Sequence, residues 1–388
     1  MMARSVLFAL LRAAACEQAA SQNLVNTCTP EMLEQVYTLA AKHDLAHLVC
    51  HALEPLSLPP CPAMQKFQTA KSQAIFRYMK MDHAYAQILG CLEAAKIPFI
   101  PLKGSVLRRQ YPEPWMRTSC DIDILVHEND LDRAQEALAS ILSFQSSGKG
   151  DHDIAMTSPA GVSLELHYDT VQQRYANDLR RGVLATFWER AVPVTENAFE
   201  HRIPDGLFYF YHIAHMAKHF ETGGCGVRSI LDLWVLNHCS DCDQQSRDAL
   251  LTQGGLLKFA RVMEDLSESW FSGKPWETVT EQAGNYILYG GMYGNQANRA
   301  AFGQAKAGGK LRYLLTRRLF MPYDYLKAEY PVLQKHKWLT PVFQVVRWFR
   351  MLFSGNAIRH IKEIATNVRT KDNARQDTQK MLKDLGLE

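Results

Sequence analysis

A change in the spacing of hydrophobic residues near Ile97 limits most strongly the folds that this chain can adopt. Before this point, as in 29-TPEMLEQVYTLAAKHDLAHLVCHAL-53, apolar residues recur with the period of an α-helix. Thr29 and Pro30 provide an N-cap and a first helical residue, and a long helix is expected from about 62 to 95. Strand-like alternation then enters the pattern and persists to about residue 203, after which helical spacing returns.

These changes predict an α+β protein in which a small mixed sheet is flanked by helical regions. The expected parts are an N-terminal helical region over 1–96, a mixed core over 97–203 and a C-terminal helical region over 204–388. Within the core we expect strands over 97–102 and 121–127, with a short helix after Gly104. A helix is expected over about 129–142, capped by Asn129 or Asp130. A hairpin of 154–157 and 162–168 is expected around the turn 158-SPAG-161.

Acidic residues interrupt two of the predicted strands. Asp121 and Asp123 are two positions apart, so on a strand both side chains emerge from one face while the aliphatic residues alternate to the other. In 163-SLELHYD-169 the same rule places Glu165 and His167 together on one face. Neighbouring carboxylates repel unless a cation or a proton lies between them, so the spacing indicates either a chance pair at a sheet edge or half of a metal site.

The order of these features resembles the DNA polymerase β-like nucleotidyltransferase superfamily. A Gly-Ser turn follows a strand, paired aspartates lie on the next strand, and a lone acid between leucines lies on a later one. More narrowly, the Leu-Lys-Gly turn, the arginine shortly before 121-DIDILV-126 and the strand 164-LELH-167 are similar to the bacterial uncharacterised nucleotidyltransferase family. The likeness is strongest over about 97–170 and weaker through 215–233 and 321–333.

One departure from the superfamily pattern is visible in the segment between Ser105 and Asp121. Fifteen residues separate the two, slightly more than is usual in the superfamily. The added segment contains Pro112 and Pro114, so it lengthens a loop without requiring that the strands move.

The resemblance implies a Mg²⁺-dependent enzyme that moves an NMP group from an NTP, with ATP as the expected donor, to a hydroxyl of an acceptor. Two Mg²⁺ ions suit this reaction because they neutralise triphosphate charge and lower the pKa of the attacking hydroxyl. By the resemblance, Asp121 and Asp123 would hold both ions. Glu165 would hold the ion beside the acceptor hydroxyl and would also accept its proton.

The resemblance also implies residues that bind the nucleotide. Gly104 would let the backbone approach the phosphates, and Ser105 would offer a hydroxyl and an N–H at a helix start. Lys103 and Arg117 would neutralise phosphate charge. Arg228 and Asp232, four positions apart on a later helix, either pair with each other or face the nucleotide.

Three of these neighbouring residues also have plainer interpretations, which stay open at this point. Lys103 could be a solvated residue at a strand end, and Arg117 could pair with Glu113. His167 could be a histidine whose hydrogen bonds are satisfied within the sheet.

Histidine and cysteine patterns add little support for a second metal site. His212, His215 and His219 share one face of a predicted helix, and this spacing is compatible with zinc binding. An H-E-x-x-H arrangement is lacking, so a polar seam that faces the catalytic cleft is the preferred interpretation. The nine cysteines are scattered without a framework spacing, so we expect a reducing compartment and no disulfides. The single C-x-x-C, Cys239 and Cys242, is interpreted as structural.

The C-terminal part of the chain is basic. Residues 301–388 contain nine Lys and eight Arg against seven acidic residues, an excess of ten positive charges. The segments 310-KLRYLLTRRLF-320 and 345-VVRWFRMLF-353 interleave Arg with aromatic and aliphatic residues, a composition suited to nucleic acid, an anionic membrane surface or an acidic partner. The alternative is a helix face whose basic side chains extend to water while Trp348, Phe349 and Leu352 complete a core.

The N-terminal segment 1-MMARSVLFALLRAAAC-16 predicts an amphipathic helix. Its apolar run is too short to span a bilayer and Arg12 interrupts a secretory signal pattern, so a cytoplasmic protein is expected.

Two other functions compete with nucleotidyl transfer: a catalytically inactive relative that binds nucleotide or a partner, and a nucleic-acid-binding module that uses the basic C-terminal region. Metal-dependent NTP binding would separate the enzyme and the inactive relative from the nucleic-acid-binding module. The acceptor stays open, since a small molecule such as a sugar or an antibiotic, a protein hydroxyl and an RNA end all fit.

Overall fold

The computed structural model describes residues 2–16, 22–170, 178–238, 243–275, 278–292, 294–353 and 372–387. The chain divides into two units, each of which is described by itself. The first unit comprises Met1–Ala214 and Val227–Trp276, and the second comprises His215–Gly226 and Glu277–Glu388.

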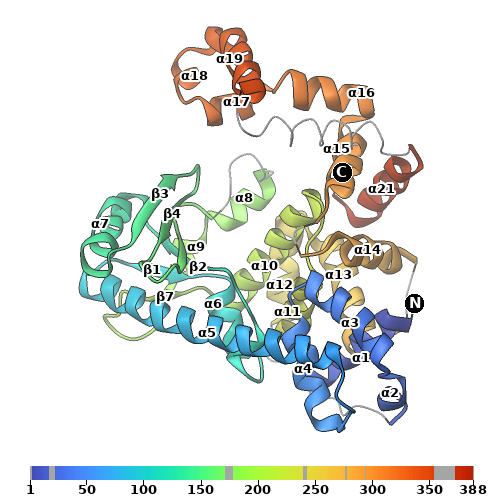
Figure 1. Cartoon of the computed structure of the whole chain (residues 1–388). Helices are drawn as coiled ribbons and strands as arrows, with labels where there is room; N and C mark the ends of the chain where they lie inside the picture. Colours follow the sequence, from blue (N-terminus) through green and yellow to red (C-terminus); the bar gives the residue numbers. More distant parts are fainter. Residues whose placement is uncertain are drawn as a thin grey trace. The chain divides into compact units, whose positions relative to one another are not determined.

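Helices at the start of the chain form one part of the first unit (blue in Figure 1). They are α1 (Met2–Ala15), α2 (Gln22–Thr27), α3 (Pro30–Lys42), α4 (Ala46–Leu53), the short 3₁₀ helix η1 (Glu54–Leu56) and α5 (Pro62–Ala94). The predicted cap of α3 is confirmed, because the Thr29 hydroxyl accepts a hydrogen bond from the Met32 N–H at 3.3 Å. The predicted amphipathic first helix is also confirmed, since α1 buries its leucines.

A five-stranded mixed sheet forms the centre of the first unit. The strands are β1 (Phe99–Pro101), β2 (Asp121–Val126), β3 (Gln145–Lys149), β4 (Asp153–Thr157) and β5 (Ser163–His167). They lie in the order β1-β2-β5-β4-β3, and β2 and β5 are parallel while the other neighbours are antiparallel. The predicted hairpin of β4 and β5 is confirmed, and its turn is closed by a hydrogen bond of 2.8 Å from the Gly161 N–H to the Ser158 carbonyl.

Two expectations for the core region need correction. The helix α7 (Leu131–Leu142) follows the short 3₁₀ helix η4 (Glu128–Asp130) and has Asp130 as its N-cap residue, but the Asp130 side chain makes no capping hydrogen bond. Its carboxylate accepts from the side chain of Arg133 instead. The strand β3 was not predicted. Its sequence QSSGK has no hydrophobic residue and all five residues are exposed, so no hydrophobic alternation marks a strand.

One face of the sheet packs against α5 and α7, and Figure 1 shows α5 running along this face. Ile122, Ile124 and Val126 of β2 join Leu164 and Leu166 of β5 in this core, together with Ile88, Leu92, Leu131 and Leu138 of the two helices. Because side chains alternate along a strand, Asp121, Asp123, Glu165 and His167 belong to the opposite face. The hydrophobic pattern of these strands therefore sets which face carries the acids.

Short helices lie between β1 and β2: α6 (Gly104–Leu107), η2 (Arg108–Gln110) and η3 (Pro114–Met116). After the sheet come α8 (Asp178–Leu184), α9 (Phe187–Arg190), the strand pair β6 (Val192–Pro193) and β7 (His201–Arg202), and α10 (Asp205–Glu221). The part of α10 up to Ala214 belongs to the first unit and the part from His215 to the second. The helices α11 (Val227–His238), α12 (Gln244–Gln253) and α13 (Leu257–Phe271) complete the first unit. Phe8 of α1 stacks on Trp270 of α13 with ring centroids 4.5 Å apart.

The second unit is helical in its described residues. Its helices are α14 (Thr278–Gly290), α15 (Gln296–Ala307), α16 (Lys310–Tyr313), the π-helix η5 (Leu314–Leu319), α17 (Tyr323–Glu329), α18 (Val332–Lys335), the 3₁₀ helix η6 (Lys337–Leu339), α19 (Thr340–Phe353) and α21 (Asp372–Leu385). The last helix, α21, packs against α14 and α15. The predicted α+β fold with helical flanks is confirmed.

Two further expectations concern cysteines and membrane spans. No disulfide joins the cysteines of the described residues, and Cys239 and Cys242 lie outside those residues. Within the described ranges, no helix has both the length and the apolar character that crossing a bilayer requires.

Candidate active site

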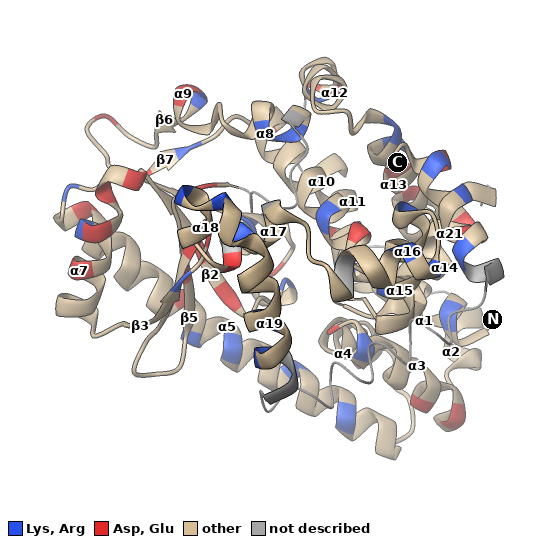
Figure 2. Ribbon diagram, turned by 90° about the horizontal axis from the view of Figure 1, so that it is seen from above, with Lys and Arg blue, Asp and Glu red and all other residues tan. Residues whose placement is uncertain are grey.

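The parallel pairing of β2 with β5 brings two of the predicted acids together. In the register of these strands Asp123 lies opposite Glu165, and Asp121 lies opposite Ser163. The side chain of Asp123 is buried, with 3% of its surface exposed, whereas Asp121 and Glu165 are partly exposed. Red segments on the central sheet in Figure 2 include the acidic residues of β2. The sequence spacing thus predicted the convergence of Asp123 and Glu165.

Two nitrogen atoms contact the buried Asp123 carboxylate. Lys103 Nζ lies 2.7 Å from Asp123 Oδ1, and His167 Nε2 lies 2.9 Å from the same oxygen. Burial by itself opposes ionisation of Asp123, but Lys103 and the His167 hydrogen bond outweigh it and hold the pKa of this carboxyl well below its usual range. Asp123 is therefore a carboxylate that is compensated within the protein.

The surroundings of Asp121 have the opposite effect. Burial, the charge of Asp123 and the charge of Glu165 raise the pKa of the Asp121 carboxyl, and Lys103 and Arg117 only partly offset them. Ionised Asp121 is thus disfavoured by burial and by two neighbouring carboxylates. Such a site attracts a cation.

The donor atoms of Asp123, Glu165 and His167 could hold a metal ion together. One ligand atom from each of the three residues lies within 4.8 Å of the other two. Glu165 Oε2 is 3.3 Å from His167 Nε2, so the imidazole faces both carboxylates. His167 is a residue that the sequence prediction of the site omitted, although its position two residues after Glu165 on the same strand face was the available signal.

Lys103 adopts a backbone conformation that residues other than glycine rarely occupy. Its φ is +45° and its ψ is −118°, at the junction between β1 and α6. Strained residues of this kind persist where the surrounding structure holds them, and they concentrate at functional sites. Here the ion pair with Asp123 outweighs burial and keeps the pKa of the Lys103 ammonium above its usual value. Lys103 is therefore fixed against the acids and is not a solvated strand end.

Gly104 begins α6 at a position where an added side chain would force its neighbours to move. A Cβ atom there would lie 2.8 Å from Arg117 Nη1 and 3.2 Å from the Ser119 Cβ. Arg108 reinforces this contact, since its Nε donates to the Gly104 carbonyl at 3.1 Å and its Nη2 donates to Ser119 Oγ at 2.6 Å. The turn is therefore packed directly against the segment that leads into β2.

Ser105 is buried and lines a pocket of about 210 Å³. The pocket is also lined by Tyr78, Met81, Asp82, Tyr85, Arg108, Arg109, Pro114 and Ile122. Ile122 alternates with Asp121 and Asp123 along β2, so this pocket and the acid cluster lie on different sides of the strand.

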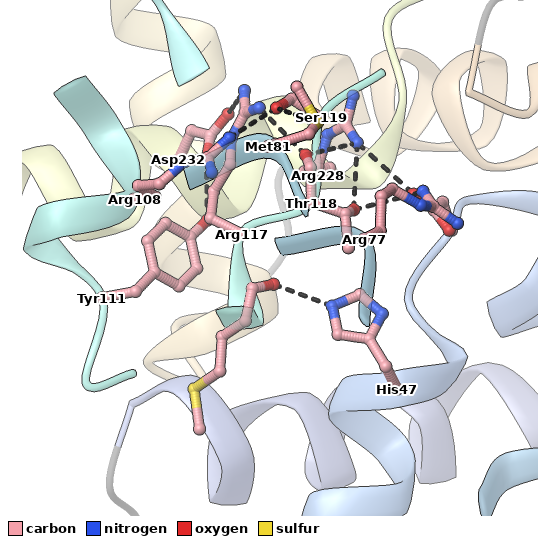
Figure 3. Close-up of polar contacts among 12 residues, drawn as sticks. His47, Arg77, Met81, Arg108, Tyr111, Arg117, Thr118, Ser119, Arg228 and Asp232 are labelled. Atoms are coloured by element: carbon pink, nitrogen blue, oxygen red, sulfur yellow. Dashed lines mark hydrogen bonds and ion pairs between the residues drawn. The ribbon is translucent and has the colours of Figure 1, made fainter. Parts of the chain in front are cut away.

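Arg117 and Asp232 form a buried ion pair beside the turn (Figure 3). Arg117 Nη2 lies 2.9 Å from Asp232 Oδ2 and Arg117 Nε lies 3.2 Å from Asp232 Oδ1, while the Tyr111 hydroxyl donates to Asp232 Oδ1 at 2.7 Å. Asp232 is 1% exposed. The alternative pairing of Arg117 with Glu113 is therefore wrong.

Arg228 lies in the neighbouring part of the same network. Its Nη1 donates to the Thr118 carbonyl at 2.9 Å and lies 3.6 Å from Asp44 Oδ2. Asp44 also accepts a hydrogen bond of 2.7 Å from the Thr118 hydroxyl and one of 3.1 Å from Arg77. Arg228 and Asp232 thus contact different partners around residues 117–118.

The three histidines of α10 do not form a metal cluster. His212 is buried and its Nε2 donates to the Ser229 carbonyl at 3.1 Å, whereas His215 and His219 contact each other, with their Nε2 atoms 3.2 Å apart. Among the residues that the structure describes, the group at Asp123, Glu165 and His167 is the only one with metal-binding geometry.

Comparison with known proteins gives one match. A family model described as "Uncharacterised nucleotidyltransferase" matches residues 29–272. This segment contains Lys103, the acid cluster and the Arg117–Asp232 pair. No curated protein and no solved structure gives a significant match.

Proposed function

The chain belongs to the uncharacterised nucleotidyltransferase family, and we propose that it transfers an NMP group from an NTP, with ATP as the expected donor, to an acceptor hydroxyl. Family membership makes it a nucleotidyltransferase. The observation that supports the finer proposal is the pairing of Asp123 with Glu165 on adjacent parallel strands, next to Asp121.

The acid cluster fits the divalent ions that this chemistry needs. Asp121, Asp123 and Glu165 would hold two Mg²⁺ ions, and the donor atoms of Asp123, Glu165 and His167 already lie close together. Carboxylate oxygens are the ligands that Mg²⁺ prefers. When bound, the ions would neutralise the triphosphate charge and lower the pKa of the attacking hydroxyl.

The protein residues have complementary roles in the proposal. Glu165 is partly exposed, so its carboxylate is accessible to take the proton of the acceptor hydroxyl. Lys103 presents an ammonium group at Asp123, where it would attract the phosphates, and Gly104 and Ser105 would contact the phosphates beside it.

The predicted nucleotide contacts of Arg117, Arg228 and Asp232 stay predictions. Their buried hydrogen bonds support a role in holding residues 117–119 against the Lys103–Gly104 turn. Such support would preserve the geometry of the first contacts with the nucleotide.

The wider setting of the reaction also belongs to the proposal. We expect a cytoplasmic enzyme of bacterial origin whose acceptor is a small molecule, a protein or RNA. The basic C-terminal region would contact nucleic acid or an acidic partner if the acceptor is of that kind.

Metal-dependent ATP binding tests this function. Calorimetric titration of the full chain with ATP is carried out in Mg²⁺ and again in EDTA, for the wild type, for Asp121→Asn and for Glu113→Gln. Glu113 is an exposed acid in the segment that precedes β2, and it serves as the control for Asp121. We expect the wild type to bind ATP in Mg²⁺ and to lose about tenfold or more of its affinity in EDTA. In Mg²⁺, Asp121→Asn should show a similar loss of ATP affinity, whereas Glu113→Gln should not. Equal ATP affinity in Mg²⁺ and EDTA would favour the nucleic-acid-binding module.

A further inference from the structure

His167 has a position that a purely structural histidine of the sheet does not require. It is 2% exposed, and its Nε2 lies 2.9 Å from Asp123 Oδ1 and 3.3 Å from Glu165 Oε2. One N–H can donate a well-aligned hydrogen bond to only one of these oxygens at a time. The nitrogen therefore lies where the two carboxylates converge.

The second ring nitrogen of His167 gives an independent observation. Nδ1 is buried and makes no hydrogen bond within the described structure. An unpaired buried nitrogen lowers stability, and a residue kept only to support the sheet would gain nothing by it. The orientation of the ring instead directs Nε2 at the acids.

We propose that His167 Nε2 is a direct ligand, together with Asp123 and Glu165, of one of the divalent ions at the active site. This inference rests on the proposed function and changes its donor set from carboxylates alone to two carboxylates and one imidazole. Binding of the ion replaces the hydrogen on Nε2. A ring that starts neutral moves this proton to Nδ1 with no net release, whereas an imidazolium already holds a proton on Nδ1 and releases the Nε2 proton to solvent.

The mixed donor set affects which ion the site selects. Mg²⁺ is bound almost entirely through oxygen, whereas a nitrogen ligand favours first-row transition ions. Mn²⁺ accepts both carboxylate and imidazole ligands. The site therefore binds Mn²⁺ more tightly than Mg²⁺, and His167 supplies most of that difference.

Electron paramagnetic resonance of Mn²⁺ tests the proposal without an acceptor or an assay of activity. Mn²⁺ is titrated into the full-length protein, and electron spin echo modulation is recorded on the bound ion. A directly bound imidazole produces modulation from its ¹⁴N nucleus. Uniform ¹⁵N labelling of histidine in the wild-type protein then identifies the source, and this step does not depend on the folding of any variant.

Variants locate the ligand. His167→Gln is compared with His152→Gln, a matched control because the His152 ring lies 5.4 Å from the His167 ring and its Nδ1 contacts Asp151 and Asp153. We expect ¹⁴N modulation in the wild type and in His152→Gln but not in His167→Gln. We also expect Mn²⁺ affinity to fall by about 10-fold to 100-fold in His167→Gln, with a smaller change for Mg²⁺ measured by competition.

Two results would overturn the inference, and they can be distinguished. If Mn²⁺ binds with no ¹⁴N modulation, and Asp123→Asn abolishes binding, then His167 is a hydrogen-bonding support and the proposed function stands. If Mn²⁺ does not bind the wild type, or binds Asp123→Asn equally well, then both the ligand and the proposed metal site are wrong.

Discussion

Asp121 and Asp123 show how neighbouring residues with the same side chain can differ in their effect on stability. Both lie on the same face of β2. Asp123 is compensated by Lys103 and His167, which lower its pKa, whereas burial and the neighbouring acids raise the pKa of Asp121. Asp123 thus stabilises the metal-free fold in its ionised form, and ionised Asp121 destabilises it.

Asparagine substitutions should separate these effects. Because the folded pKa of Asp121 is raised, its charge costs stability above the unfolded pKa, and Asp121→Asn should be at least as stable as the wild type at pH 7. Asp123→Asn leaves Lys103 and His167 without their carboxylate and should lose about 3 kcal/mol. Urea unfolding followed by circular dichroism measures both. Similar losses of unfolding free energy in the two variants would show that this electrostatic assignment is wrong. Both variants should lack transferase activity.

At the scale of elements, the site depends on how the segment between α6 and β2 is fixed. Arg117 reaches Asp232 of α11, Arg228 of the same helix reaches Thr118, and the Gly104 turn packs against Arg117. The two contacts with α11 join residues more than a hundred positions apart in the chain. The Arg117–Asp232 contact is a buried ion pair, so its energy depends on the charge state of Asp232.

The Arg117–Asp232 pair predicts a pH-dependent loss of stability. Burial opposes ionisation of Asp232, but Arg117 outweighs it and lowers the pKa of the carboxyl. The stabilisation is therefore fully present above the unfolded pKa, about 3.9, and is lost as the pH falls through the lower folded pKa. Asp232→Asn should lose about 3–5 kcal/mol at pH 7, and the difference from the wild type should shrink below about pH 4.

Urea unfolding at pH 7, 5 and 3.5 measures this difference. Asp130→Asn is the control, because Asp130 pairs with Arg133, a side chain that is largely exposed, and such pairs contribute at most about 1 kcal/mol. A loss in Asp232→Asn that stays constant over this range would contradict the assignment to an ion pair.

Glycine substitutions test the packing of the turn. Gly104→Ala places a methyl group against Arg117 and Ser119, so we expect a loss of about 1–3 kcal/mol and weaker ATP binding. Gly90→Ala is the matched control in α5, where an added Cβ meets nothing within 4 Å, and it should gain about 0.5–1 kcal/mol. Thermal unfolding and ATP titration give both readouts. A Gly104→Ala protein with normal stability and affinity would mean that the turn does not require this close contact.

Local sequence was sufficient to predict the acids but not their surroundings. The two-residue spacing of Asp121 and Asp123, the hydrophobic alternation of β5 and the Pro-Gly turn before it specify the strand faces and hence the pairing of Asp123 with Glu165. The partner of Arg117 lies 115 residues away, and no local pattern identifies it. The strand β3 was missed because its polar residues gain their order only by pairing with β4.

At the scale of the whole molecule, the family match and the basic region occupy different parts of the chain. The match covers residues 29–272, whereas the excess of positive charge lies in 301–388. Several apolar side chains of the second unit are exposed, including Trp338, Val345 and Phe349. Phe349 therefore does not complete a core, in contrast to one interpretation of the sequence.

The basic region gives a test of whether the acceptor is RNA. If it is, changing Arg312, Arg317 and Arg318 to Gln should weaken RNA binding and reduce the slope of log affinity against log salt by about 2, because each lost phosphate contact releases fewer counterions. ATP binding should be unchanged. Filter binding over a range of salt concentrations measures the slope. An unchanged slope in the folded triple variant would exclude RNA contact through these residues and favour a small-molecule or protein acceptor.

The position of the transferred label tests the central claim most directly. The protein is incubated with Mg²⁺, a cell lysate and ATP that carries ³²P at either the α-phosphate or the γ-phosphate. Transfer of an NMP group breaks the bond between the α-phosphorus and the oxygen that bridges it to the β-phosphorus. The acceptor therefore gains the α label, and the γ label leaves in pyrophosphate. We predict α label alone on the acceptor with the wild type and no label with folded Asp121→Asn. Transfer of the γ label, or equal labelling by Asp121→Asn, would contradict the account.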